Sequence, residues 1–184
     1  MLVLVLAGGK QINLTDSIPP LTDVPFVPYL DTTGNISADL EGKIGVYAIF
    51  DAEKSLQYVG ISRDIASSLK LHMVRVPSQC HWLKFVTVTK PSRTVLSEMQ
   101  TAWSGDLAVD IELWEQPLDC RRLMTDDEKH QLEQAIDEAE QEKVLKNVAR
   151  RVEKDVLAQL AARGIAFDVR FNPKRKSEGI LDIK

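Results

Sequence analysis

The amino-acid sequence predicts an α+β fold, and three patterns along the chain support this prediction. Apolar residues alternate over 44–50 and resume over 56–60, with turn-forming residues between them, which is typical of a β-hairpin. A helical pattern follows directly after this hairpin. A second, much longer helical pattern covers 125–163, so the chain combines a small antiparallel sheet with helices. Its 184 residues are enough for one domain with extensions or for two very small domains.

Residues 1–44 are predicted to form an N-terminal strand and a proline-rich arm. Met1–Ala7 is apolar, but it is shorter than the ~20 residues of a membrane span and no basic residue precedes it. A buried strand is therefore expected there. A regular helix or central strand is excluded over 11–42 by four prolines, Pro19, Pro20, Pro25 and Pro28. We expect an ordered extended arm, because it carries four apolar anchors, Phe26, Val27, Tyr29 and Leu30.

Residues 45–104 are predicted to form a compact core. Its three strands are expected over 44–50, 56–60 and 82–88. Its two helices are expected over 65–73 and 91–103. Asp64 is a good N-cap for the first helix, since its carboxylate can accept hydrogen bonds from the first free N–H groups. Gly105 is expected to end the second helix.

Two spaced triplets in this core carry a resemblance to a known family. Gly45-Val46-Tyr47 lies in the first strand and Tyr58-Val59-Gly60 in the second, and a helix with a late histidine follows. This order resembles the GIY-YIG nuclease superfamily, and most of all its domain that is fused to monothiol glutaredoxins in plant plastids. The resemblance covers about 45–103 and implies a three-stranded antiparallel sheet flanked by helices.

The resemblance also implies a candidate site for phosphodiester cleavage. Tyr47 and Tyr58 match the two motif tyrosines, and His72 lies on the first helix, where family members often carry a histidine. Glu98 on the second helix matches the glutamate that binds a divalent metal, so the implied cofactor is Mg²⁺ or Mn²⁺. Either tyrosine taken singly is more often a strand residue that covers the sheet, and it is their joint occurrence that favours a site.

The sequence departs from the family pattern on the first helix, and the family's late asparagine is also not evident after Glu98. Ser68 stands where the family carries an arginine, one helical turn before the histidine. A serine supplies neither a charge nor a bidentate clamp for a phosphate. Arg63 in the preceding loop is the candidate substitute cation, and Lys70 or Arg75 are weaker candidates. Two functions stay open: a metal-dependent DNA endonuclease with a degenerate site, and a catalytically inactive protein-interaction module that kept the fold.

Residues 105–184 are predicted to form a C-terminal extension. Its long helix, from Thr125 to Arg163, is expected to be continuous or to break near 141–143, where the apolar stripe slips phase. The alternation over 165–171 predicts a half-buried strand, and a charged tail follows. The long helix has more apolar stripe than a small core can cover, so its stripe is expected to pack on the core or on a partner chain, either a protein partner or a second copy in a homo-oligomer.

The charge and the cysteines narrow the classes of function. A net charge of −4 argues against a general nucleic-acid binder, although an acidic protein can still carry a local basic groove. Cys80 and Cys120 lack CxxC spacing and a histidine cluster, so zinc is not expected. Both are expected to be buried thiols in a reducing compartment, which predicts a cytoplasmic protein that does not enter a membrane.

Overall fold

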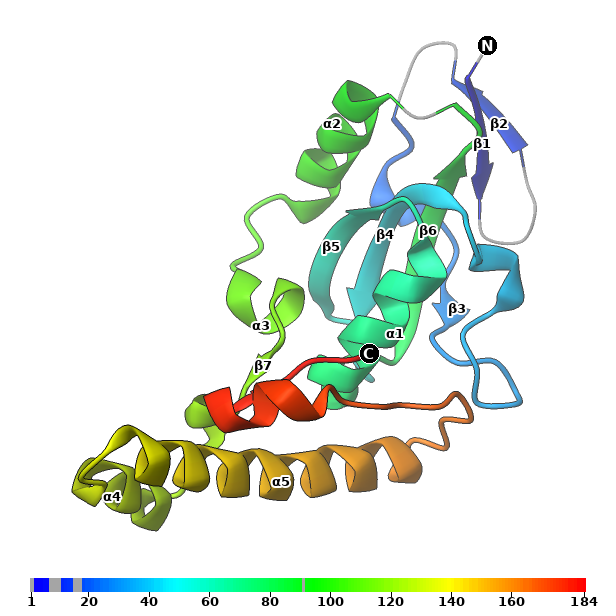
Figure 1. Ribbon diagram of the computed structural model, residues 1–184. Helices are drawn as coiled ribbons and strands as arrows, with labels where there is room; N and C mark the ends of the chain where they lie inside the picture. The colour runs from blue at the N-terminus through cyan, green and yellow to red at the C-terminus, as the bar shows by residue number, and fades with distance from the viewer. Residues whose placement is uncertain (1, 7–10, 15–17, 91) are drawn as a thin grey trace. The chain divides into compact units, whose positions relative to one another are not determined.

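The computed structural model describes residues 2–6, 11–14, 18–90 and 92–184. The chain divides into two compact units, Met1–Asp110 and Ile111–Lys184 (Figure 1). The first unit contains the two triplets and every predicted site residue, and the second contains the long helical region. Among the residues that the structure describes, no helix is long and apolar enough to cross a membrane.

A six-stranded antiparallel sheet lies at the centre of the first unit (Figure 1). The three predicted strands are confirmed and lie in the order β6-β4-β5: β4 (Ile44–Phe50), β5 (Leu56–Ser62) and β6 (Trp82–Val88). The sheet is wider than predicted, because β6 also pairs with two N-terminal strands, β1 (Leu2–Leu6) and β3 (Val27–Pro28), and β1 pairs with β2 (Gln11–Leu14). The N-terminal strand is thus present, while Met1 and Ala7 lie outside the described residues.

Two capped helices flank the sheet. Asp64 is the N-cap of α1 (Ile65–Arg75), as predicted, and its carboxylate accepts the backbone N–H of Ser67 at 3.2 Å. The side-chain hydrogen bond from Ser67 is the largest cause that holds the pKa of Asp64 below its usual value. Ser92 caps α2 (Arg93–Ser104), and Gly105 ends it with φ +49°. The predicted start at Pro91 lies outside the described residues. Three short 3-10 helices complete the unit: η1 (Leu21–Asp23), η2 (Ala38–Leu40) and η3 (Pro77–Gln79).

The two helices pack on opposite faces of the sheet. Side chains of β4 alternate between the faces, so Tyr47 and Ile49 point to one side while Val46, Ala48 and Phe50 point to the other. The second set belongs to the core that includes three residues of α2, Leu96, Met99 and Trp103. The first set faces α1, which also contacts β4 and β5. This division decides which of the predicted site residues can meet.

Over residues 18–42, the proline-rich arm is ordered, as predicted, and is attached to the core at several points. Val24, Tyr29, Ile36 and Leu40 are buried. The hydrogen bonds that bind the arm to the core include those from Trp103 Nε1 to the Pro19 carbonyl at 2.9 Å, from Lys84 Nζ to the Leu21 carbonyl at 2.9 Å, and from the Tyr29 hydroxyl to the Leu69 carbonyl at 2.8 Å. The Lys84 ammonium also lies 4.1 Å from the centroid of the Phe26 ring, and burial lowers its pKa.

The second unit consists of helices around a two-stranded sheet. Its elements are α3 (Ile111–Glu115), β7 (Leu118–Asp119), η4 (Cys120–Leu123), α4 (Asp126–Gln134), α5 (Glu138–Ala162), η5 (Pro173–Glu178) and β8 (Ile180–Leu181). The long α5 buries its apolar stripe within this unit, against η4, η5 and β8. The buried stripe residues are Val148, Ala149, Val152, Val156 and Leu160.

The long helical region is broken, but not where the phase of its stripe predicts. The break lies at 135–137 rather than near 141–143. Ala135 leaves the helical conformation with ψ 123°, and the Asp137 side chain accepts the N–H of Glu140 at 2.8 Å and caps α5. The Asp-x-x-Glu sequence that starts at Asp137 is the helix-start signal that marks this position. The predicted outer ends of the region are confirmed: Thr125 starts α4 with a capping box, and α5 ends with Arg163 as its C-cap, followed by Gly164 with φ 70°.

The predicted strand over 165–171 is wrong, although its alternation is real. Residues in this stretch alternate between half-buried and exposed. However, the structure pairs only Phe171, in an isolated bridge with Ile183, and the strand of the extension is β8, which pairs with β7. Alternation of apolar and polar residues indicates that one face of an extended segment is half-buried. A β-strand also requires a neighbouring strand whose backbone N–H and C=O groups are free to pair.

A partly buried ion pair joins α4 to α5 and makes the stability of the second unit depend on pH. Arg151 donates to both carboxylate oxygens of Glu128, at 2.7 and 2.6 Å, and the hydrogen bond from Arg151 is the largest cause that lowers the pKa of Glu128. A lowered folded-state pKa means that this contribution is complete above about pH 4.5 and is lost as the pH falls through the folded-state value. We expect Glu128→Gln to lower the free energy of unfolding by about 1.5 kcal/mol at neutral pH, and this difference should vanish in acid.

Urea unfolding at a series of pH values measures this difference directly. The matched control is Glu133→Gln on the same helix, because Glu133 is 77% exposed and lies 4.0 Å from its partner His130. The control should change the free energy of unfolding by less than about 0.5 kcal/mol. A Glu128→Gln deficit that persists unchanged below the pKa of the wild-type carboxyl would contradict the role given to the ion pair.

Candidate functional site

Tyr47, Tyr58 and His72 form a cluster on one face of the sheet. In the β4–β5 register, Tyr47 lies opposite Gly60 and Ile49 opposite Tyr58, so both tyrosine rings project from the same face. His72 reaches this face from α1. The ring centroids are 6.2 Å apart for the tyrosine pair, and His72 lies 4.8 Å from Tyr58 and 5.7 Å from Tyr47. The sequence prediction that the tyrosines lie together on neighbouring strands is confirmed.

The tyrosine–histidine cluster is buried and internally hydrogen-bonded. The exposed fractions are 2% for Tyr47, 5% for Tyr58 and 4% for His72. The Tyr47 hydroxyl lies 2.8 Å from Nε2 of His72. Gly60 closes the cluster on the β5 side, because a Cβ added there would lie 2.6 Å from the Tyr47 hydroxyl oxygen. In this conformation a phosphate in solvent does not reach the two phenol groups.

Ser68, at the position where the family carries an arginine, forms a hydrogen bond and supplies no charge. Its Oγ donates to Oγ of Ser62 at 2.8 Å. Ser62 Oγ in turn donates to the Asp64 carbonyl at 2.7 Å and accepts the Asp64 N–H at 3.0 Å. This network ties the first turns of α1 to the end of β5, so the serine has a structural use that an arginine side chain would displace.

Glu98 does not join the cluster. It lies exposed on α2, the helix that packs on the opposite face of the sheet, so the sheet separates its carboxylate from Tyr47 and Tyr58. Within the described part of the chain, no group of three or more His, Cys, Asp or Glu side chains is placed to hold a metal ion. Mg²⁺ and Mn²⁺ prefer carboxylate oxygens gathered around one point. Glu98, the metal ligand that the resemblance implies, has no such group of carboxylates around it among the described residues.

Arg63 is also placed apart from the tyrosines. It is exposed in the loop between β5 and α1 and lines a groove with Ile61 and Leu96, whose side chains lie on the α2 side of the sheet. Tyr58 is not among the residues that line this groove. The structure thus brings three of the five predicted site residues together and leaves the cation and the carboxylate elsewhere.

The same groove contains residues that the sequence analysis did not single out. Arg93, Ser97 and Gln100 line it from α2. Their spacing of i, i+4 and i+7 places them on one flank of a helix, next to the apolar stripe. This spacing could be read from the sequence, but it does not by itself indicate a groove. The groove exists because the β5–α1 loop lies beside this flank of α2.

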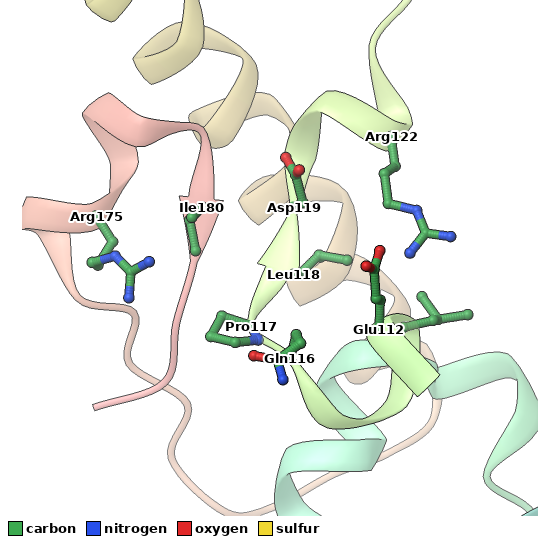
Figure 2. Close-up of a pocket in the computed structure, with 9 residues that line it drawn as sticks. Glu112, Gln116, Pro117, Leu118, Asp119, Arg122, Arg175 and Ile180 are labelled. Carbon is green, nitrogen blue, oxygen red and sulfur yellow. The ribbon is translucent and has the colours of Figure 1, made fainter. Parts of the chain in front are cut away.

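The second unit carries a smaller pocket of about 230 Å³ (Figure 2). Glu112 comes from α3, Asp119 from β7, and Arg122 and Arg175 from the two 3-10 helices, as Figure 2 shows. The pocket is therefore lined by side chains of both charges and by apolar side chains that include Leu118. Arg175 is already paired with Glu178 at 2.9 Å and with Asp182 at 3.6 Å, so its charge is used within the unit.

Both cysteines are buried thiols, as predicted. Burial is the largest cause that raises the pKa of Cys120 to about 12. A thiol with that pKa is protonated at neutral pH and is a poor nucleophile.

The fold and the cluster define a mixed α+β protein with an antiparallel sheet and a buried tyrosine–histidine cluster. No protein-family model matches the chain. It is similar to the bifunctional monothiol glutaredoxin-S16, chloroplastic, of Arabidopsis thaliana, with 33% identity over 94 residues. The matched region is 51% of this chain and 30% of that protein.

The sequence predicts a resemblance to a domain that is fused to monothiol glutaredoxins of plant plastids. The name of this relative, a chloroplastic monothiol glutaredoxin, agrees with that prediction. Because the match spans only 30% of that protein, the activities of the relative do not transfer with it. The relative is described as chloroplastic, and a cytoplasmic location for this chain stays a prediction.

Proposed function

We propose that this chain is a GIY-YIG-type domain that no longer cleaves phosphodiester bonds and acts as a binding module. The observation that carries the proposal is the separation of the predicted site: the tyrosine–histidine cluster faces α1, while Glu98 is exposed on α2 at the other side of the sheet. Hydrolysis of a phosphodiester requires positive charge and an activated water at one phosphate. Groups held on opposite faces of a sheet cannot act on one phosphate.

The hydrogen bonds of the cluster support a structural use for the motif residues. The Tyr47 hydroxyl is already engaged by His72, and Ser68 by Ser62. Loss of the phosphate-binding arginine alone would remove several kcal/mol of transition-state stabilisation, of the order of 3 kcal/mol for one charged donor. The retained tyrosines then serve the packing of α1 on the sheet.

A second candidate function is a metal-dependent DNA endonuclease with a degenerate site. It is favoured by the joint position of Tyr47, Tyr58 and His72 on one face, because three motif residues meet there. This candidate requires Mg²⁺ or Mn²⁺ at Glu98 and Arg63 as the substitute cation. Both groups would have to move to the tyrosine face of the sheet for that role.

A plasmid-nicking assay separates the two candidates. Supercoiled plasmid is incubated with the full chain and Mg²⁺ or Mn²⁺, and we expect no nicking above the protein-free rate for wild type, Arg63→Ala, Glu98→Ala or Ser68→Arg. Nicking by wild type that Glu98→Ala and Arg63→Ala both abolish, and that Ser68→Arg increases, would overturn the proposal in favour of the nuclease.

Tyr47→Phe supplies a positive readout beside the absence of cleavage. The substitution removes the hydroxyl that lies 2.8 Å from His72 Nε2 in a buried position. A buried polar atom that loses its partner costs about 1–3 kcal/mol, so urea unfolding should show a loss of about 2 kcal/mol. A tyrosine kept only for catalysis would leave the free energy of unfolding nearly unchanged.

A further inference from the structure

A groove of about 850 Å³ opens on the side of the sheet away from the tyrosine–histidine cluster. It lies between the end of β5 with the loop that follows it and the first turns of α2. We call it the arginine groove. Its lining residues are Ile44, Ile61, Ser62, Arg63, Arg93, Leu96, Ser97 and Gln100.

The arginine groove is locally basic in an acidic chain. Arg63 and Arg93 are both exposed and line it, and no carboxylate is among its lining residues. Neither arginine forms an ion pair or hydrogen bond with any residue that the structure describes. The whole chain carries a net charge of −4, so the charge of this groove is opposite in sign to that of the chain as a whole.

The other groups of the groove suit an anionic ligand that also has an apolar body. Ser97 adds a hydroxyl, and Gln100 adds an amide that is held in place by its hydrogen bond to the Val59 carbonyl at 3.0 Å. Arg93 is the first residue of α2, so the positive end of the helix dipole lies at the same place. Ile44 and Leu96 provide apolar wall on which a sugar can pack.

We propose that the arginine groove binds the phosphodiester backbone of a nucleic acid. Guanidinium groups match phosphate oxygens in a bidentate manner and position a protein on the backbone. Because no aromatic residue lines the groove, stacking with bases is not supplied there. The expected binding is therefore independent of base sequence, weak, and strongly dependent on salt. This inference rests on the proposed function in one respect: it names the ligand that the proposed binding module binds.

The test is fluorescence anisotropy with a short labelled DNA duplex, in EDTA so that metal-dependent cleavage cannot occur. Two phosphate contacts predict a slope of about −1.8 in log affinity against log salt between about 50 and 200 mM. Arg63→Gln/Arg93→Gln should weaken binding at least about tenfold at the lowest salt and reduce the slope by nearly its whole value.

The matched control removes the same charge from the second unit. Lys146→Gln/Arg150→Gln replaces two exposed basic residues of α5 and should keep both the affinity and the slope. Circular dichroism should show that both double variants are folded, since all four side chains are exposed.

Three results would overturn the inference. They are the absence of duplex binding by wild type, an equal loss in both double variants, and a labelled polyglutamate peptide that binds as tightly and depends on the same two arginines. Nicking in the plasmid assay would refute the proposed function but not the groove, because the anisotropy is measured without metal.

Discussion

Gly45→Ala is expected to lower the free energy of unfolding of the first unit by about 3 kcal/mol or more. A Cβ at this position would lie 2.0 Å from the backbone carbonyl oxygen of Val86. Gly45 sits on β4 opposite Thr87 of β6, so the obstructing atom belongs to the paired strand and cannot rotate away. The methyl group would therefore separate two central strands and break their ladder locally.

Two other glycines make the comparison quantitative. Gly60→Ala brings its Cβ within 2.6 Å of the Tyr47 ring and 2.7 Å of the Tyr58 ring, which can shift slightly, so a loss of about 2 kcal/mol is expected. Gly42→Ala, in the turn before β4, meets nothing within 4 Å, so its φ of +64° opposes an alanine at a cost of about 1 kcal/mol. Urea unfolding should rank the three losses in this order.

This ranking bears on the meaning of the triplets. Gly45 and Gly60 are the outer glycines of the two motif triplets, and each stands where a side chain would meet the sheet or the tyrosine rings. Their presence is thus explained by packing without any catalytic role. Equal, small losses for Gly45→Ala and Gly42→Ala would show that the close approach between β4 and β6 is not what requires the glycine.

Trp103→Ala is expected to lower the free energy of unfolding by about 4 kcal/mol. The indole is 4% exposed and belongs to the core formed by α2 and the sheet. Its Nε1 also donates to the Pro19 carbonyl at 2.9 Å, so one side chain supports both the core and the start of the arm. The substitution removes apolar burial, leaves a cavity and releases an arm carbonyl.

Trp103→Phe separates the two contributions. It keeps most of the ring but removes the Nε1–H, so a loss of about 1–2 kcal/mol is expected together with faster proteolysis of the arm. Trp114→Phe in the second unit is the matched control, because that indole is also buried and its loss should not affect the arm. If Trp103→Phe is cleaved in the arm no faster than wild type, the hydrogen bond to Pro19 does not hold the arm.

Part of the candidate site was predictable because its signal is local. Tyr47 and Tyr58 lie on adjacent strands of one hairpin, and the register of that hairpin follows from its alternation and its turn. His72 follows from helical spacing after the Asp64 N-cap. Glu98 and Arg63 were not predictable in the same way. Whether they can reach the tyrosines depends on which face of the sheet α2 covers. The spacing of apolar residues along a helix does not indicate that face.

The amino-acid sequence by itself determined the elements of the first unit. Alternation, helix caps and proline placement predict β4, β5, β6, α1, α2 and the ordered arm, because each depends on residues that are neighbours in the chain. Tertiary structure alone decided that β1 and β3 widen the sheet and that 165–171 has no ladder. It also decided that α2 carries Glu98 to the face opposite the tyrosines, and that Arg63 and Arg93 line one groove. These outcomes arise from backbone pairing and packing between distant segments, which a one-dimensional pattern does not encode.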